Sequence, residues 1–133
     1  MKRMRNEQRL LGLGCAAAFA TILFAAEPSG ADRGREIYEK RCAGCHSLDR
    51  AKVGPPLRGV FGRRAAAESG FPYSEGLKKA RVMWDAATLD RWLTDPDSVI
   101  PDNDMSFRLD QAAERAAIIE YLKQLANKPA GGR

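Results

Sequence analysis

Apolar residues recur three and four positions apart in several segments of this chain, which is the spacing of one face of an α-helix. The first segment runs from Asp32, a predicted N-cap, to about Arg41. Gly34, Ile37 and Tyr38 would lie on its inner face, and its other positions are mostly charged. The pattern predicts an N-terminal amphipathic helix.

A second amphipathic helix is predicted after residue 84. Asp85 can cap this helix, and Pro96 should end it. Between them, Leu89, Trp92 and Leu93 follow the i, i+3, i+4 pattern of a buried face. We expect this face to pack into the core.

The last helix is predicted to start at Asp110. It places Ile118, Tyr121, Leu122 and Leu125 on one stripe, which suits packing across the first helix. No segment shows a convincing strand pattern. The sequence therefore predicts an all-α fold.

Long loops separate the predicted helices. Glycines and prolines crowd residues 47–71, and a further loop is expected over 97–109. A short helix is predicted over 74–80. The expected architecture has about four to five short helices joined by loops long enough to wrap a ligand.

The N-terminus has the pattern of a secretory signal. A basic start precedes an uncharged run over residues 10–26, and Ser29-Gly30-Ala31 offers a small-x-small cleavage site. Residues 1–31 are therefore predicted to be a signal peptide. Cleavage after Ala26 is an alternative, and so is an uncleaved membrane anchor, because 17 apolar residues span about 25 Å as a helix.

The remaining chain is predicted to form one small domain, residues 32–127, with a frayed tail at 128–133. Loss of residues 1–31 removes four basic and two acidic residues, so the net charge falls from +5 to +3. This small excess gives no reason to expect nucleic-acid binding.

The chemistry of the chain is concentrated in Cys42-Ala43-Gly44-Cys45-His46. C-x-x-C-H is the spacing at which two thiols attach haem and the next imidazole binds its iron. A redox dithiol and half of a zinc site are the alternatives. A zinc site needs four ligands, but His46 is the only histidine and Cys15 the only other cysteine. The motif therefore favours covalently bound haem c.

The second axial ligand decides whether such a haem transfers electrons or binds small molecules. With no second histidine, methionine is the natural candidate, and only Met83 and Met105 follow the signal segment. Met83 lies in an apolar patch, where packing explains it. Met105 lies in an otherwise polar loop, so we expect His46 and Met105 to be the metal ligands.

These features resemble the class I cytochromes c, in particular the mitochondrial type and the bacterial cytochromes c2. The resemblance covers residues 32–126. Besides the haem motif, it is carried by the segments Gly54 to Arg63, Gly70 to Ser74, Trp84 with Thr88-Leu89, Ile100 to Met105, and Glu114 to Lys123. It implies the class I cytochrome c fold, with short helices and long loops wrapped round a covalently bound haem.

The resemblance also implies roles for further residues. The Pro55 carbonyl should accept a hydrogen bond from His46. Arg63, Tyr73 and Trp84 should be partners of the haem propionates. Gly34 and Tyr38 should meet Tyr121 where the terminal helices cross, and Phe107 should screen the haem edge.

Two positions depart from the mitochondrial pattern. Leu77 stands where that family has an asparagine bonded to a buried water, and Trp92 stands where it has a tyrosine bonded to the methionine sulfur. A poorer polar network around Met105 is therefore expected.

The resemblance implies a single-electron carrier of the periplasm rather than an enzyme, since no catalytic residue set is present. Its partners would be redox proteins: a membrane oxidase, a quinol-oxidising complex or a periplasmic dehydrogenase. A monomer is expected, with membrane association if the N-terminus stays uncleaved. The alternatives are a dedicated haem subunit of a dehydrogenase, and a haem enzyme or gas binder with labile methionine ligation.

Overall fold

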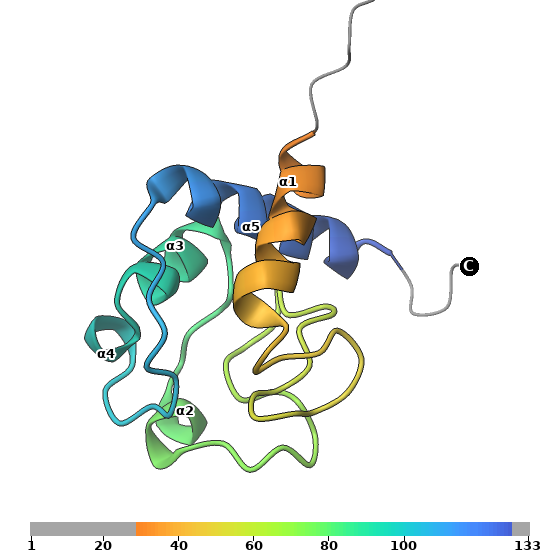
Figure 1. The fold of residues 1–133 in the computed structure, drawn as a ribbon. Coiled ribbons are helices and arrows are strands. Elements are labelled where there is room, and N and C mark those ends of the chain that lie inside the picture. The colour runs from red at the N-terminus through yellow and green to blue at the C-terminus, as the bar shows by residue number, and fades with distance from the viewer. Residues whose placement is uncertain (1–28, 129–133) are drawn as a thin grey trace, which may run out of the picture.

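The computed structural model describes residues 29–128, and these form helices and loops with no strand (Figure 1). One isolated β-bridge joins Arg64 and Met83. The elements are α1 (Gly30–Ile37), a π-helical segment (Tyr38–Cys42), α2 (Glu75–Lys79), α3 (Ala86–Thr94), α4 (Pro96–Val99) and α5 (Ala112–Ala126). The all-α prediction is confirmed.

The predicted signal segment up to residue 28 and the tail from residue 129 lie outside the described residues. Among residues 29–128, no helix is long and apolar enough to cross a membrane.

Helix α1 begins earlier than the sequence predicted. Its N-cap is Ser29, whose hydroxyl accepts a hydrogen bond from the Asp32 backbone at 3.2 Å. Asp32 lies in the first turn instead, where a carboxylate favours the positive end of the helix dipole. Ala31 is buried in this turn, so the small-x-small sequence considered for cleavage forms the cap and first turn of α1.

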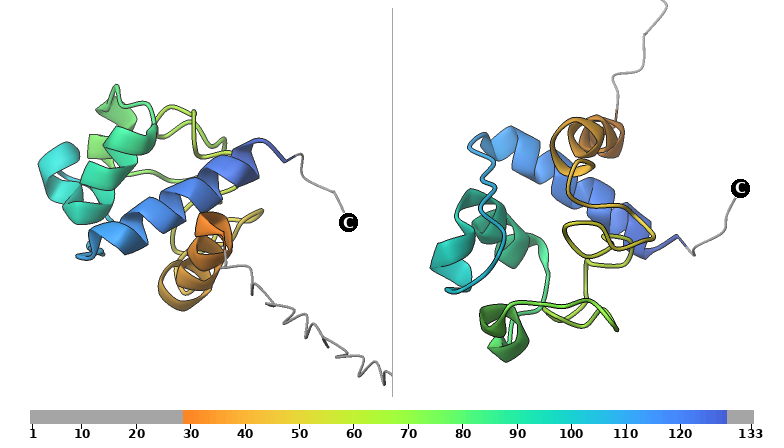
Figure 2. Two further views of the ribbon diagram at one scale, coloured as in Figure 1. Left: turned by 90° about the horizontal axis from the view of Figure 1, so that it is seen from above. Right: turned by 60° about the horizontal axis from the view of Figure 1, so that its bottom comes forward.

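Helices α1 and α5 cross in close contact, as the views in Figure 2 show. At the crossing, a methyl group added to Gly34 would lie 2.1 Å from the Ala117 carbonyl oxygen. The rings of Tyr38 and Tyr121 lie beside it with centroids 5.8 Å apart. The expected meeting of the terminal helices at Gly34 is confirmed.

Helix α3 is fixed by a reciprocal cap, in which Asp85 and Thr88 each bond the other's backbone N–H. Pro96 ends this helix as predicted but also opens α4, so the loop expected from residue 97 starts with a helical turn. Proline suits the first position of a helix, where its missing N–H has no partner to lose. Helix α5 starts at Ala112, not at Asp110, with Gln111 as its N-cap.

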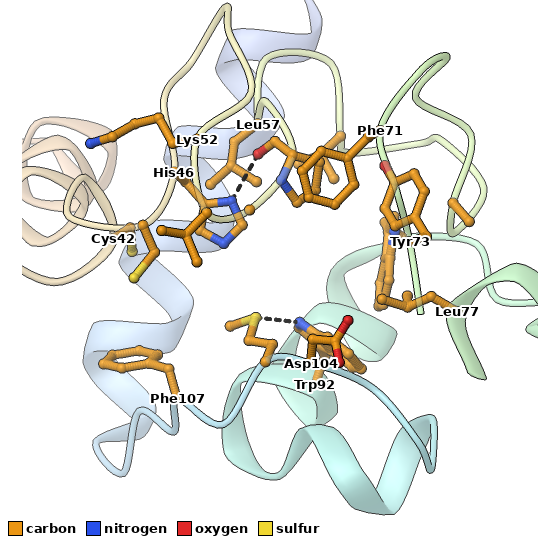
Figure 3. Close-up of a pocket in the computed structure, with 18 of the residues that line it drawn as sticks. Cys42, His46, Lys52, Leu57, Phe71, Tyr73, Leu77, Trp92, Asp104 and Phe107 are labelled. Carbon is orange, nitrogen blue, oxygen red and sulfur yellow. Dashed lines mark hydrogen bonds between the residues drawn. The ribbon is translucent and has the colours of Figure 1, made fainter. Parts of the chain in front are cut away.

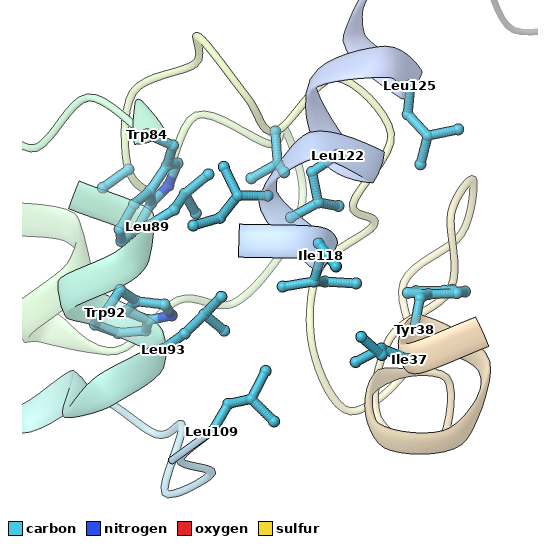
Figure 4. Close-up of a cluster of buried hydrophobic side chains, with 14 of the residues drawn as sticks. Ile37, Tyr38, Trp84, Leu89, Trp92, Leu93, Leu109, Ile118, Leu122 and Leu125 are labelled. Carbon is cyan, nitrogen blue, oxygen red and sulfur yellow. The ribbon is translucent and has the colours of Figure 1, made fainter. Parts of the chain in front are cut away.

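The core lies between α1, α3 and α5 (Figure 4). Leu89, Trp92 and Leu93 from α3 face Ile118 and Leu122 from α5, and all are buried. These are the residues that the helical spacing placed on inner faces. These side chains pack against one another, and they also form one wall of a large cavity.

Candidate functional site

The loops and helices enclose a cavity of about 500 Å³. Its lining is mainly apolar and includes side chains from α3, α5 and each of the long loops. The structure brings every predicted site residue to this cavity: Cys42, Cys45, His46, Pro55, Arg63, Tyr73, Trp84 and Met105. Met83 is 46% exposed and does not line it.

His46 is held by the loop that follows it. Its Nδ1 lies 2.8 Å from the Pro55 carbonyl oxygen, and donation of the Nδ1 proton there leaves Nε2 without a proton. Figure 3 shows the second ring nitrogen pointing into the cavity. Burial, and secondarily the charge of Lys52, lowers the pKa of His46 below its ordinary value, against the opposing effect of the bond to Pro55. A neutral imidazole with one free nitrogen can bind a metal ion through that nitrogen.

Gly54 makes the position of His46 possible. A methyl group at Gly54 would lie 2.2 Å from Cε1 of the imidazole. The Gly54 N–H also donates to the Cys45 carbonyl at 2.9 Å, which ties the loop to the haem motif. The sequence analysis counted Gly54 only as a loop residue, since its contact depends on a ring eight positions away.

Cys42 and Cys45 lie in a helical turn at the end of the π-helical segment. Cys42 ends the π-helical segment, and its carbonyl accepts from the backbone N–H groups of Cys45 at 3.1 Å and His46 at 2.9 Å. Cys42 and Cys45 form no disulfide. Burial, together with the charge of Cys45, raises the pKa of the Cys42 thiol to about 11, so it is uncharged at neutral pH. Within residues 29–128, no cluster of three or more histidine, cysteine or carboxylate side chains is placed to hold a metal ion.

Met105 faces His46 across the cavity. Figure 3 shows His46 and Trp92 on opposite sides of the cavity, and Trp92 is hydrogen-bonded to the Met105 sulfur. Trp92 Nε1 lies 3.2 Å from Met105 Sδ. The backbone N–H of Met105 donates to Asn103 Oδ1 at 2.8 Å, which fixes the loop.

The prediction of a poorer polar network around Met105 is therefore wrong at one of the two positions. The indole N–H of Trp92 supplies a donor to the sulfur in place of a phenol. Leu77 lines the cavity and offers no polar group, so no donor replaces the asparagine that mitochondrial cytochromes have at this position. The sequence could not show this bond, because two residues 13 positions apart meet only once α3 and the following loop are packed.

Polar groups gather at another part of the cavity wall. Arg63 donates to Glu68 Oε2 at 2.8 Å and to the Pro56 carbonyl at 3.3 Å. Tyr73 is half-buried, and burial raises the pKa of its phenol. Trp84 is buried beside them in the lining. These are the donors that the resemblance assigned to propionates.

The cavity fits a haem group in the chemistry of its lining. It offers two thiols at the attachment spacing, an imidazole with a free nitrogen, and a thioether on the facing wall. Apolar side chains make up most of the remaining surface, and Phe107 closes part of it. Gly54 leaves room for the imidazole that a larger residue would displace.

Comparison with known proteins agrees with this chemistry. Residues 31–126 match the family described as Cytochrome c. Cytochrome c of Chlamydomonas reinhardtii is 42% identical over 106 residues, which cover 76% of this chain and 95% of the relative. Cytochrome c2 iso-2 of Magnetospirillum fulvum is 46% identical over 87 residues, covering 63% and 91%. Among solved structures, cytochrome cH from Methylobacterium extorquens has a TM-score of 0.67 at 35% identity, covering 71% of this chain and 97% of that one.

Proposed function

The chain belongs to the cytochrome c family as a class I cytochrome c, a haem c electron carrier, and from this premise we propose that His46 and Met105 are its axial ligands. The observation that carries the proposal is the pairing of these side chains across one cavity, each with its own hydrogen-bond partner. Members of the family carry covalently bound haem c, and Cys42 and Cys45 are the residues that would attach it here.

Bound haem c supplies a one-electron couple. The residues of the chain set the conditions for fast exchange. Pro55 holds the imidazole in one orientation, and Trp92 and Asn103 hold the methionine loop. When both ligands stay in place in either oxidation state, little rearrangement accompanies electron transfer, and a methionine with a histidine favours a high reduction potential.

The mainly apolar cavity has a second effect. Its apolar side chains would replace water around a bound haem, which would favour the less charged, reduced state. Arg63, Tyr73 and Trp84 are proposed to donate to the propionates, whose charge would be costly to bury without partners.

The proposed setting is the periplasm, where the protein would shuttle electrons between redox partners of a respiratory-type chain. The N-terminal sequence pattern supports export. A membrane oxidase, a quinol-oxidising complex and a periplasmic dehydrogenase are the proposed partner classes. Purification distinguishes a free monomeric shuttle from a dedicated subunit, because a dedicated subunit would remain bound to a large dehydrogenase.

The ligand proposal is tested by the absorption spectrum of the oxidised protein and its Met105→Ala variant. We expect the long-wavelength band of an iron–thioether bond in the wild type and its loss in the variant, because no other thioether lines the described cavity. Met83→Ala is the matched control, since this methionine lies outside the lining. It should keep the band. A wild-type spectrum without the band would contradict Met105 ligation and favour an open iron that binds small molecules.

A further inference from the structure

Glu68 forms an ion pair at the back of the cavity wall that the electron-carrier role does not explain. Its Oε2 accepts from Arg63 Nη1 at 2.8 Å. The two side chains are only 24% and 33% exposed, so solvent screens this pair less than a fully exposed one. Arg63 lines the cavity, whereas Glu68, which it contacts, does not. One guanidinium therefore separates a fixed carboxylate from the proposed haem.

The same guanidinium reaches the loop that holds His46. Arg63 Nη2 donates to the Pro56 carbonyl at 3.3 Å, and the neighbouring Pro55 carbonyl accepts from His46. Pro56 is itself buried. Glu68 thus fixes an arginine that contacts both the cavity and the loop behind the proximal ligand.

We propose that Glu68 is a positioning residue that lowers the reduction potential of the haem through Arg63. This rests on the proposed haem site. A negative charge near the iron favours the oxidised state, which carries one more positive charge. In addition, an arginine that is paired with Glu68 neutralises a haem propionate less completely. The negative charge near the iron is therefore larger.

The other charged groups at this wall do not cancel the effect. Arg64 lines the cavity but is exposed, and its charge is therefore well solvated. Tyr73 stays neutral at ordinary pH, because burial raises the pKa of its phenol. Glu68 is the carboxylate held in contact with Arg63.

The test is an equilibrium redox titration, followed by absorption, of the haem-loaded wild type and its Glu68→Gln variant. Glutamine keeps the shape of the side chain and removes the charge. The midpoint potential should rise in this variant. Glu36→Gln is the control, because it removes the same charge from an exposed position on α1 outside the cavity lining. Equal shifts in the two variants would overturn the proposal.

The role of Arg63 is tested by repeating the Glu68→Gln comparison in an Arg63→Ala background. Without the arginine nothing in the described structure holds the carboxylate at the cavity wall, so it should turn to solvent and its removal should shift the potential less. A shift of the same size in both backgrounds would overturn the route through Arg63.

The same spectra separate this proposal from the proposed function. If every variant keeps the iron–thioether band, an unchanged potential in Glu68→Gln contradicts the role of Glu68 alone. A wild type without the band contradicts the His46/Met105 ligand set instead.

Discussion

At the scale of single residues, the bond between Trp92 and Met105 is the least expected contact of the site. An indole N–H donates to the thioether sulfur at 3.2 Å. Because a thioether sulfur has two lone pairs, it can accept this bond and still offer a lone pair to a metal. The bond restricts the rotation of a side chain that would otherwise be flexible. In the proposed haem site, Trp92 would therefore support Met105 without being a ligand itself.

Removal of this donor should weaken the hold on Met105. In Trp92→Phe we expect the equilibrium between bound and detached methionine to shift toward detachment by up to about fivefold, since a hydrogen bond contributes about 1 kcal/mol. The measurement is the denaturant concentration at which the iron–thioether band disappears, which should fall.

Tyr73→Phe is the comparison, because it removes a hydroxyl from the same cavity without touching Met105 in the described hydrogen bonds. If both variants lose the band at the same denaturant concentration, the indole has no special role in holding the sulfur.

At the scale of elements, the fold depends on how closely α1 approaches α5. A Cβ added to Gly34 would lie 2.1 Å from the Ala117 carbonyl oxygen and 2.7 Å from the Tyr121 Cβ. Backbone atoms cannot move aside as a flexible side chain can. The glycine therefore determines the distance between the two helices. Because the π-helical segment continues directly from α1, this distance also sets the position of Cys42.

Gly34→Ala should destabilise the protein by about 1–3 kcal/mol, as expected for overpacking of a tight contact. Glu36→Ala is the control in the same helix, because the Glu36 side chain is exposed. Alanine suits a helix at least as well as glutamate, so this variant should stay within about 0.5 kcal/mol of the wild type. Thermal unfolding of the two haem-loaded variants measures the difference, and equal melting temperatures would show that the crossing tolerates a side chain.

At the scale of the whole molecule, the cofactor site occupies the centre of the core. Leu89, Trp92, Leu93, Ile118 and Leu122 belong both to the hydrophobic core and to the cavity lining. Apolar surface of this extent is favourable only when another apolar group covers it. Haem is therefore expected to complete the core.

Without haem, the chain should lose its cooperative fold. Cys42→Ala/Cys45→Ala prepared free of haem removes both attachment sites, and its helical circular dichroism should fall well below that of the haem-loaded wild type. Its thermal transition should be broad or absent. A sharp transition with native helicity would show that the polypeptide core is sufficient by itself.

Much of this site could be predicted from the sequence because its chemistry is local. The spacing of Cys42, Cys45 and His46 lies within one helical turn, and the inner faces of α3 and α5 follow from a repeat of three to four residues. Resemblance added Pro55, and the structure places its carbonyl 2.8 Å from His46. Helix starts were less accurate, because Ser29 and Asp32 are both good capping residues and only the backbone geometry decides between them.

What the sequence by itself determined is the kind of chemistry and the faces that are buried, since both depend on residues a few positions apart. The tertiary structure alone decided that Trp92 bonds Met105, that Glu68 holds Arg63, and that Gly54 lies against His46. Each of these contacts crosses a loop or joins two elements. Their geometry is fixed by how closely the elements pack, and that distance is a property of the whole core rather than of any segment.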